Sequence, residues 1–155
     1  MSVLQLQKTT DPIVRQKSEQ INLFDDNLHK LVDDMFDTMY YNGGIGLAAV
    51  QIGVLKKVIV INLGEPNTEL VMINAKIIEK SENKELQGEG CLSVDGLYGE
   101  ANRSTSVTVQ YQDLNGTTHI KEASGLMAQC IQHEVDHTEG RLFIDYEDTN
   151  ITIGI

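Results

Sequence analysis

Cysteine and basic residues are scarce in this chain of 155 residues. Two cysteines, Cys91 and Cys130, are too few for a disulfide framework, so we expect a reduced, intracellular protein in which each thiol has its own role. Only 12 lysines and arginines stand against 23 acidic residues, which gives a formal net charge of −11. This charge disfavours binding to nucleic acid or to an anionic membrane, because both need a basic patch.

The chain also has no visible targeting segment, internal repeat or linker. No basic stretch followed by an apolar run opens the sequence, so neither a signal peptide nor a transit peptide is indicated and a cytoplasmic location is expected. Residues 38–55 carry no charge, but this stretch includes four glycines and is too short and too polar for a membrane span of about 20 apolar residues. We therefore expect a single domain over residues 1–155.

Hydrophobic periodicity predicts two helices, at residues 25–41 and 124–138, because apolar residues recur there every three or four positions. Alternating or continuous apolar runs predict strands at 58–63, 70–79, 107–111, 117–122 and 142–146. Asn115-Gly116 between two of these runs is typical of a hairpin turn. Strands placed before and between helices, without a regular βαβ order, indicate an α+β fold.

The second predicted helix contains the pattern His-Glu-x-x-His at residues 133–137. His133 and His137 are four positions apart, so their rings lie on one face of the helix and can bind one metal ion. Glu134 can then reach a water bound to that metal. The alternative is a pair of exposed histidines with an incidental glutamate on an amphipathic helix.

A catalytic metal site usually has three protein ligands and one open position. Cys130 lies seven residues before His137, a helical rise of about 10.5 Å, so we expect it to be a small buried residue and not a ligand. Cys91 is free to approach from another element and follows two glycines, which permit a close approach of the backbone. A core thiol in a turn is the alternative for Cys91.

A run of small residues, 43–49, precedes Gln51, the polar side chain of an otherwise apolar stretch from Ile45 to Val54. A buried amide must find hydrogen-bond partners. Its NH₂ group can donate to a developing oxyanion, or the side chain can serve the backbone alone.

Three segments in order, Gly44-Ile45-Gly46-Leu47-Ala48-Ala49-Val50-Gln51, Glu89-Gly90-Cys91-Leu92-Ser93 and Gln132-His133-Glu134-Val135-Asp136-His137, resemble the three motifs of the peptide deformylases. The resemblance implies an α+β fold with antiparallel or mixed sheets around a central helix that carries the metal ligands. It implies a hydrolase that removes the N-formyl group from the initiator methionine of new polypeptides and releases formate.

The resemblance also assigns roles to individual residues. It implies one divalent metal ion, iron(II) natively and zinc, nickel or cobalt after purification, held by Cys91, His133 and His137. Glu134 would act as general base and then acid on a metal-bound water, and Gln51 and the Leu92 N–H would stabilise the oxyanion. The implied substrate-binding residues are Ile45, Gly46, Gly90, Leu126, Gln129 and Cys130. Asp136 is expected to pair with Arg103 behind the ligands.

Four departures from the family pattern are Val50, Val94-Asp95, Gln87 and Thr138-Glu139. The sequence also ends where bacterial relatives continue into a C-terminal helix linked with ribosome docking. We therefore expect contact with the ribosome or the nascent chain, if any, to differ from theirs. A monomer in a bacterial cell, or in a bacterial cell infected by a virus, is expected.

Two other functions remain open at this stage. A small zinc endopeptidase can also carry His-Glu-x-x-His, usually with a third ligand downstream. A metal-binding module without turnover would have four ligands in a closed site and no need for Glu134.

Overall fold

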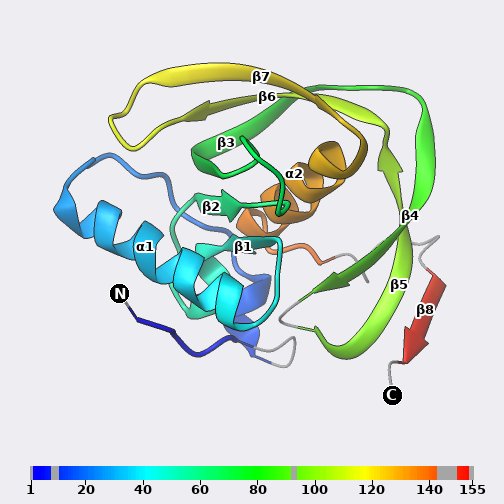
Figure 1. Ribbon diagram of the computed structural model, residues 1–155, viewed down its shortest axis with the longest axis horizontal. Helices are drawn as coiled ribbons and strands as arrows, with labels where there is room; N and C mark the ends of the chain where they lie inside the picture. Colours follow the sequence, from blue (N-terminus) through cyan, green and yellow to red (C-terminus); the bar gives the residue numbers. More distant parts are fainter. Residues whose placement is uncertain (1, 8–10, 92–93, 143–149, 154–155) are drawn as a thin grey trace.

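The structure, a computed structural model, describes residues 2–7, 11–91, 94–142 and 150–153; for 86–101 and 150–153 it describes the backbone alone. Within these residues the chain forms two α-helices, two 3₁₀ turns and eight strands (Figure 1). In chain order they are η1 (Pro12–Arg15), α1 (Asp26–Tyr41), β1 (Gly46–Ala48), η2 (Ala49–Ile52), β2 (Val58–Ile61), β3 (Leu70–Lys80), β4 (Lys84–Cys91), β5 (Val94–Ser104), β6 (Ser106–Gln112), β7 (Thr118–Ser124), α2 (Gly125–Thr138) and β8 (Asn150–Ile153).

A five-stranded antiparallel sheet, in the order β1-β2-β3-β6-β7, separates the two helices. Successive residues of a strand point to opposite faces, and the core divides accordingly. Val58 and Val60 pack with Met39 of α1, whereas Ile59 and Ile61 pack with Ile131 of α2. Because both faces are covered, β2 is buried along its whole length, which explains its continuous apolar sequence.

Both helices confirm the predicted ranges, and their ends have local causes. The Asp25 carboxylate accepts a hydrogen bond from Leu28 N (3.1 Å) at the start of α1. Gly140 follows α2 with φ +74°, a conformation that ends helices and favours glycine. A side chain at Gly140 would also collide with the Arg15 carbonyl, so this glycine allows the N-terminal region to pack against the end of α2.

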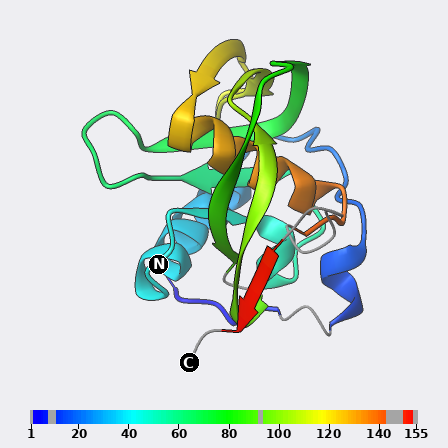
Figure 2. The same ribbon diagram turned by 90° about the vertical axis from the view of Figure 1, so that its right-hand side faces the viewer.

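A second, three-stranded antiparallel sheet in the order β4-β5-β8 lies beside the first (Figure 2). β4 and β5 are not among the predicted strands, because their polar, glycine-containing residues lack a clear apolar alternation. The hairpin at Asn115-Gly116 is confirmed between β6 and β7. Of the strand predicted at 142–146, Leu142 lies outside any strand and residues 143–146 lie outside the described residues.

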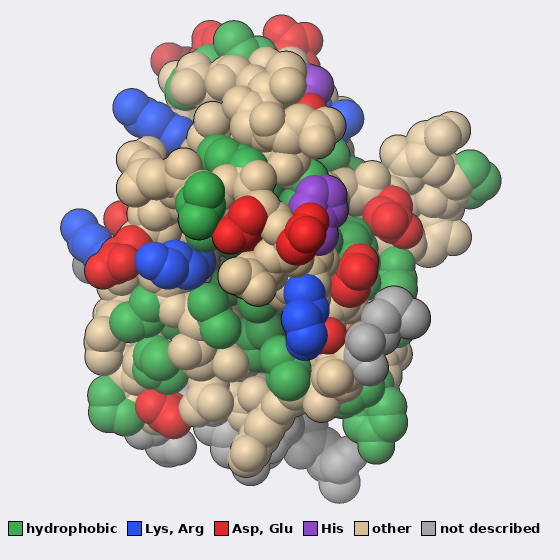
Figure 3. All heavy atoms as spheres, turned by 90° about the vertical axis from the view of Figure 1, so that its left-hand side faces the viewer, with side chains coloured by type: hydrophobic (Ala, Val, Ile, Leu, Met, Phe, Trp, Pro, Cys, Tyr) green, Lys and Arg blue, Asp and Glu red, His purple; other side chains and the backbone are tan. Residues whose placement is uncertain are grey.

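α2 contacts strands of both sheets, so the helix that carries the His-Glu-x-x-His pattern lies at the junction of the two. The α+β fold with antiparallel sheets around this helix is therefore confirmed. Among the described residues, every helix is too short or too polar to cross a membrane. The face at the α1 end of the molecule presents acidic side chains beside a few basic ones, in keeping with the net charge (Figure 3).

Candidate metal centre

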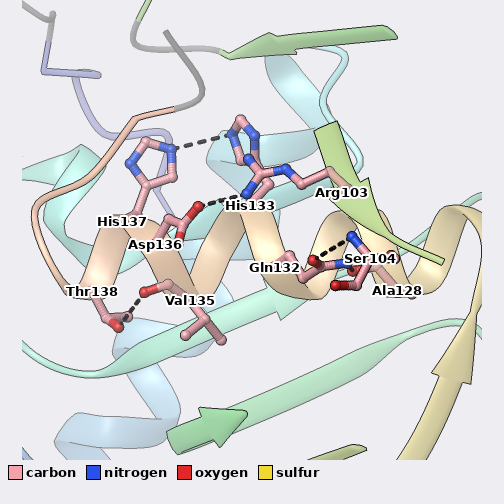
Figure 4. Close-up of polar contacts among 9 residues, drawn as sticks. All are labelled: Arg103, Ser104, Ala128, Gln132, His133, Val135, Asp136, His137 and Thr138. Carbon is pink, nitrogen blue, oxygen red and sulfur yellow. Dashed lines mark hydrogen bonds and ion pairs between the residues drawn. The ribbon is translucent and has the colours of Figure 1, made fainter. Parts of the chain in front are cut away.

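The two histidines of α2 converge as the helical spacing predicts. His133 Nε2 and His137 Nε2 are 3.3 Å apart, and both side chains are buried (Figure 4). Two ligands of a tetrahedral ion with metal–nitrogen bonds of about 2.0–2.1 Å are separated by roughly 3.3–3.4 Å. The two nitrogens therefore have the spacing of one edge of a tetrahedral site, so the donor set fits a divalent metal ion.

The electrostatic surroundings of His137 keep its ring neutral. Complete burial lowers the pKa of His137 well below its ordinary value, and the nearby charges of His133, Arg103 and Arg15 lower this pKa further. Only a neutral imidazole has the lone pair that binds a metal. His137 is thus held in the form that a metal ligand needs.

Glu134 completes the only group of three metal-binding residue types that the described side chains bring together, with His133 and His137. Its carboxylate lies against the backbone of β1, since a Cβ atom added to Gly46 would lie 2.6 Å from Glu134 Oε2. Glycine at position 46 is therefore needed to leave room for this carboxylate. The first and third sequence motifs meet at this contact, between β1 and α2.

Two polar clamps tie α2 to the end of β5, one from Asp136 and one from Gln132 (Figure 4). Arg103 Nη1 lies 2.6 Å from Asp136 Oδ2, which confirms the expected ion pair, and Arg103 is almost fully buried. One turn earlier, Gln132 Nε2 donates to Ser104 O (2.8 Å) while Gln132 Oε1 accepts from Ser104 N (3.1 Å). The pairing of Gln132 with Ser104 was not predicted from the sequence, although a glutamine between two buried positions of a helix needs hydrogen-bond partners.

Gln51 lies in η2, which contacts both β1 and α2. Its side chain is 1% exposed, and its Oε1 accepts a hydrogen bond from Ala48 N (2.9 Å). The backbone therefore binds the acceptor oxygen of the amide. This contact is what we expected if the Gln51 side chain serves the backbone. The same contact orients the donor end, the Nε2 group, away from Ala48.

The structure describes the side chains of some of the remaining predicted site residues, and only the backbone, or nothing, of the others. Gln129 and Cys130 keep 9% and 7% of their surface, whereas Leu126 is 50% exposed and Ile45 is 41% exposed. Cys130 also packs in the core beside α2, in agreement with the prediction of a buried small residue. For Gly90 and Cys91 the structure describes the backbone at the end of β4, and Leu92 lies outside the described residues.

Comparison with known proteins gives the family. A sequence model described as Polypeptide deformylase matches residues 3–150. The peptide deformylase of Finegoldia magna is 46% identical over 145 residues, which cover 94% of this chain and 90% of that protein. The peptide deformylase of Zymomonas mobilis is 44% identical over 153 residues, with 94% and 86% covered.

Solved structures agree in fold. The crystal structure of peptide deformylase from Thermotoga maritima matches with a TM-score of 0.90 and 35% identity, covering 94% of this chain and 98% of that one. The peptide deformylase of Synechococcus elongatus in complex with actinonin matches with a TM-score of 0.88 and 44% identity, covering 92% and 77%. The family model, the sequence relatives and the structures therefore agree that this chain belongs to the polypeptide deformylase family.

Proposed function

We propose that the chain hydrolyses the N-formyl group of the initiator methionine of newly made polypeptides and releases formate. The observation that carries the proposal is the group of His133, Glu134 and His137, in which the carboxylate lies beside the two converging ring nitrogens. A general base next to a three-ligand metal site is typical of metal-dependent amide hydrolases. Membership of the deformylase family supports the formyl amide as the bond that is cleaved.

Cys91 is proposed as the third ligand beside His133 and His137. One thiolate and two neutral imidazoles suit a soft or borderline divalent ion. When bound, such an ion polarises the formyl oxygen and lowers the pKa of water.

Iron(II) is proposed as the native metal, with zinc, nickel or cobalt as substitutes after purification. Iron(II) binds weakly in the Irving–Williams order and thiolates oxidise, so purification in air should lower activity; full activity in air without reductant would contradict iron(II).

Glu134 is proposed to take a proton from the attacking water and to pass it to the amine that leaves. The water oxygen bonds to the formyl carbon, the carbon–nitrogen bond breaks, and the two products are formate and the free amino group of methionine. Gly46 supports this role because it lets the carboxylate lie against β1. The orientation of the Gln51 amide supports donation from its Nε2 to the oxyanion, and the Leu92 N–H is proposed as the second donor.

The face of α2 that includes Gln129, Cys130 and His133 is proposed to form one wall of the methionine pocket, with Leu126 at its outer end. Ile45, Gly46 and Gly90 are proposed to contact the substrate backbone or formyl group. The small residual exposure of Gln129 and Cys130 supports a narrow pocket over this face. We further propose a cytoplasmic monomer that contacts the ribosome or the nascent chain.

The test follows the hydrolysis of three tripeptides with the same side chains, which carry formyl-Met, acetyl-Met or unblocked Met at the first position. An amine assay detects removal of either blocking group, a formate assay identifies the acid from the formyl peptide, and chromatography detects cleavage inside a peptide. The protein is purified without oxygen and loaded with iron(II) or nickel. Release from the formyl peptide alone is the expected result. Cleavage inside the unblocked peptide would instead indicate an endopeptidase, and no turnover by the folded, loaded protein would indicate a binding module.

A further inference from the structure

The N-terminal segment (residues 2–7) runs from α1 to the turn that carries Gln51. Ser2 N donates to Asp34 Oδ1 (2.9 Å) and Leu4 N donates to Thr38 Oγ1 (2.9 Å), so alternate residues of the segment bind successive turns of α1. At its other end, Gln7 N donates to Gln51 O (2.7 Å). The segment therefore connects a structural helix to a proposed catalytic residue.

Apolar packing holds this connection in place. Leu4 and Leu6 pack against the core cluster that joins α1 to Ala49 and Ile52 of η2. The Gln7 side chain lies beside Gly53, whose φ of +84° closes the η2 turn. The segment thus packs against both the core residues of the turn and the glycine that ends it.

Gln51 is consequently held at two points by two different parts of the chain. Ala48 N binds its side-chain Oε1, and Gln7 N binds its backbone carbonyl. The first contact sets the orientation of the amide relative to its own turn, and the second sets the position of the turn. A donor that stabilises an oxyanion acts only when it is preorganised, and a misplacement of about 1 Å can cost roughly 10²-fold in rate.

We propose that the N-terminal segment is a positioning element for the reaction, and that the Gln7 N–H holds Gln51 where its amide meets the oxyanion. This inference rests on the proposed function, since it assumes that Gln51 is the donor. Gln7 itself is a positioning residue, because it acts through Gln51.

The test compares Gln7→Pro with Gln7→Ala. Proline lacks the backbone N–H and alanine retains it, so the pair separates the backbone hydrogen bond from the side chain. Gln7→Pro should lower kcat by about tenfold, less than the roughly 10²–10³-fold cost of removing an oxyanion donor, with KM and metal content unchanged. Gln7→Ala should keep the kcat of the parent enzyme. Equal kcat losses in both variants, or none in Gln7→Pro, would overturn the inference.

Gln51→Ala supplies the specific control. In that variant the donor is absent, so adding Gln7→Pro should cause no further loss of kcat. A further loss as large as in the parent enzyme would show that Gln7 acts elsewhere and would overturn the inference. The proposed function fails separately, if the parent enzyme releases no formate. Full activity of Gln51→Ala alone would show that Gln51 is not the donor and would overturn the inference while the proposed function stands.

Thr38→Val keeps the test decisive if Gln7→Pro does not fold. Valine removes the hydroxyl that accepts from Leu4 N and leaves both contacts of Gln51 untouched. Loosening the segment at α1 should lower kcat in the same direction by a smaller factor, again with KM and metal content unchanged. A normal kcat, or an effect on metal content alone, would count against the segment as a positioning element.

Discussion

The two helices cover opposite faces of one sheet, yet they bury different chemistry. α1 has 16 residues and buries mainly apolar side chains, Met35 and Met39 among them, with Asp34 and Thr38 as its buried polar residues. α2 has 14 residues and buries six polar ones: Gln129, Gln132, His133, Glu134, His137 and Thr138. Buried polar groups reduce stability unless they are bonded, so α2 needs clamps to β5 that α1 does not need.

The contrast suggests that the two helices have different roles: α2 supplies the reacting groups, and α1 contributes to the free energy of unfolding. Changes at His133, Glu134 and His137 of α2 should damage the reaction more than the fold, because these polar groups are arranged for chemistry. Changes in the apolar face of α1 should do the opposite, because that face contributes packing alone.

The largest effect is expected from Glu134→Gln, which keeps the shape of the side chain and removes its basicity. Loss of a general base lowers the rate by about 10²–10⁴-fold, so kcat for formate release should fall in this range with metal content and Tm nearly unchanged. Glu139→Gln at the exposed end of α2 is the matched control and should retain activity. A rate within tenfold of the parent enzyme in Glu134→Gln would contradict the proposed mechanism.

The next effect is expected from the ion pair of Arg103 and Asp136. Asp136→Asn removes the carboxylate beside a guanidinium that is 1% exposed, and breaking a buried pair costs about 3–5 kcal/mol. Arg103→Met should cost a similar amount, and the double variant should cost less than the sum of the two. Urea unfolding of the three variants measures this coupling. Additivity within about 0.5 kcal/mol would show that the pair contributes no mutual stabilisation.

Met39→Ala tests the other side of the comparison. Met39 is fully buried in the α1 cluster, and removal of such a side chain costs about 2–5 kcal/mol of unfolding free energy. The activity of the folded fraction should stay at the parent value, and denaturant unfolding with a parallel rate assay measures both. Tyr41→Ala, on an exposed position of the same helix, is the control and should change stability by no more than about 0.5 kcal/mol. A fall in kcat for folded Met39→Ala would contradict the claim that the apolar face of α1 contributes to stability alone.

The sequence predicted what depends on local spacing. Both helices follow from the recurrence of apolar residues, and the convergence of His133 and His137 follows from their separation by four positions. The pairing of Arg103 with Asp136 was also expected, on the strength of the family resemblance.

The sequence could not predict what depends on packing between distant segments. The polar, glycine-containing run at β4 has no period that distinguishes a strand from a turn, and its pairing with β5 supplies the missing information. The reason for glycine at position 46 became visible only when β1 lay beside Glu134. In the sequence nothing distinguishes Gln132 from other polar residues; its role depends on Ser104, which lies 28 positions earlier and contacts it only in the folded chain.

The smallest expected effect concerns Asp34, one of the two buried polar residues of α1. Hydrogen bonding to Lys30, opposed in part by burial and assisted by Ser2 N, lowers the pKa of Asp34 below its ordinary value. A carboxyl group whose pKa is lower in the folded state stabilises the fold above its unfolded pKa of about 4, and this contribution disappears as the pH falls through the folded-state pKa. Asp34→Asn should therefore reduce the unfolding free energy by about 1 kcal/mol or less at pH 7, and by progressively less below pH ~4. Urea unfolding at several pH values measures the difference; a constant difference across that range would mean that Asp34 acts through packing and not through its charge.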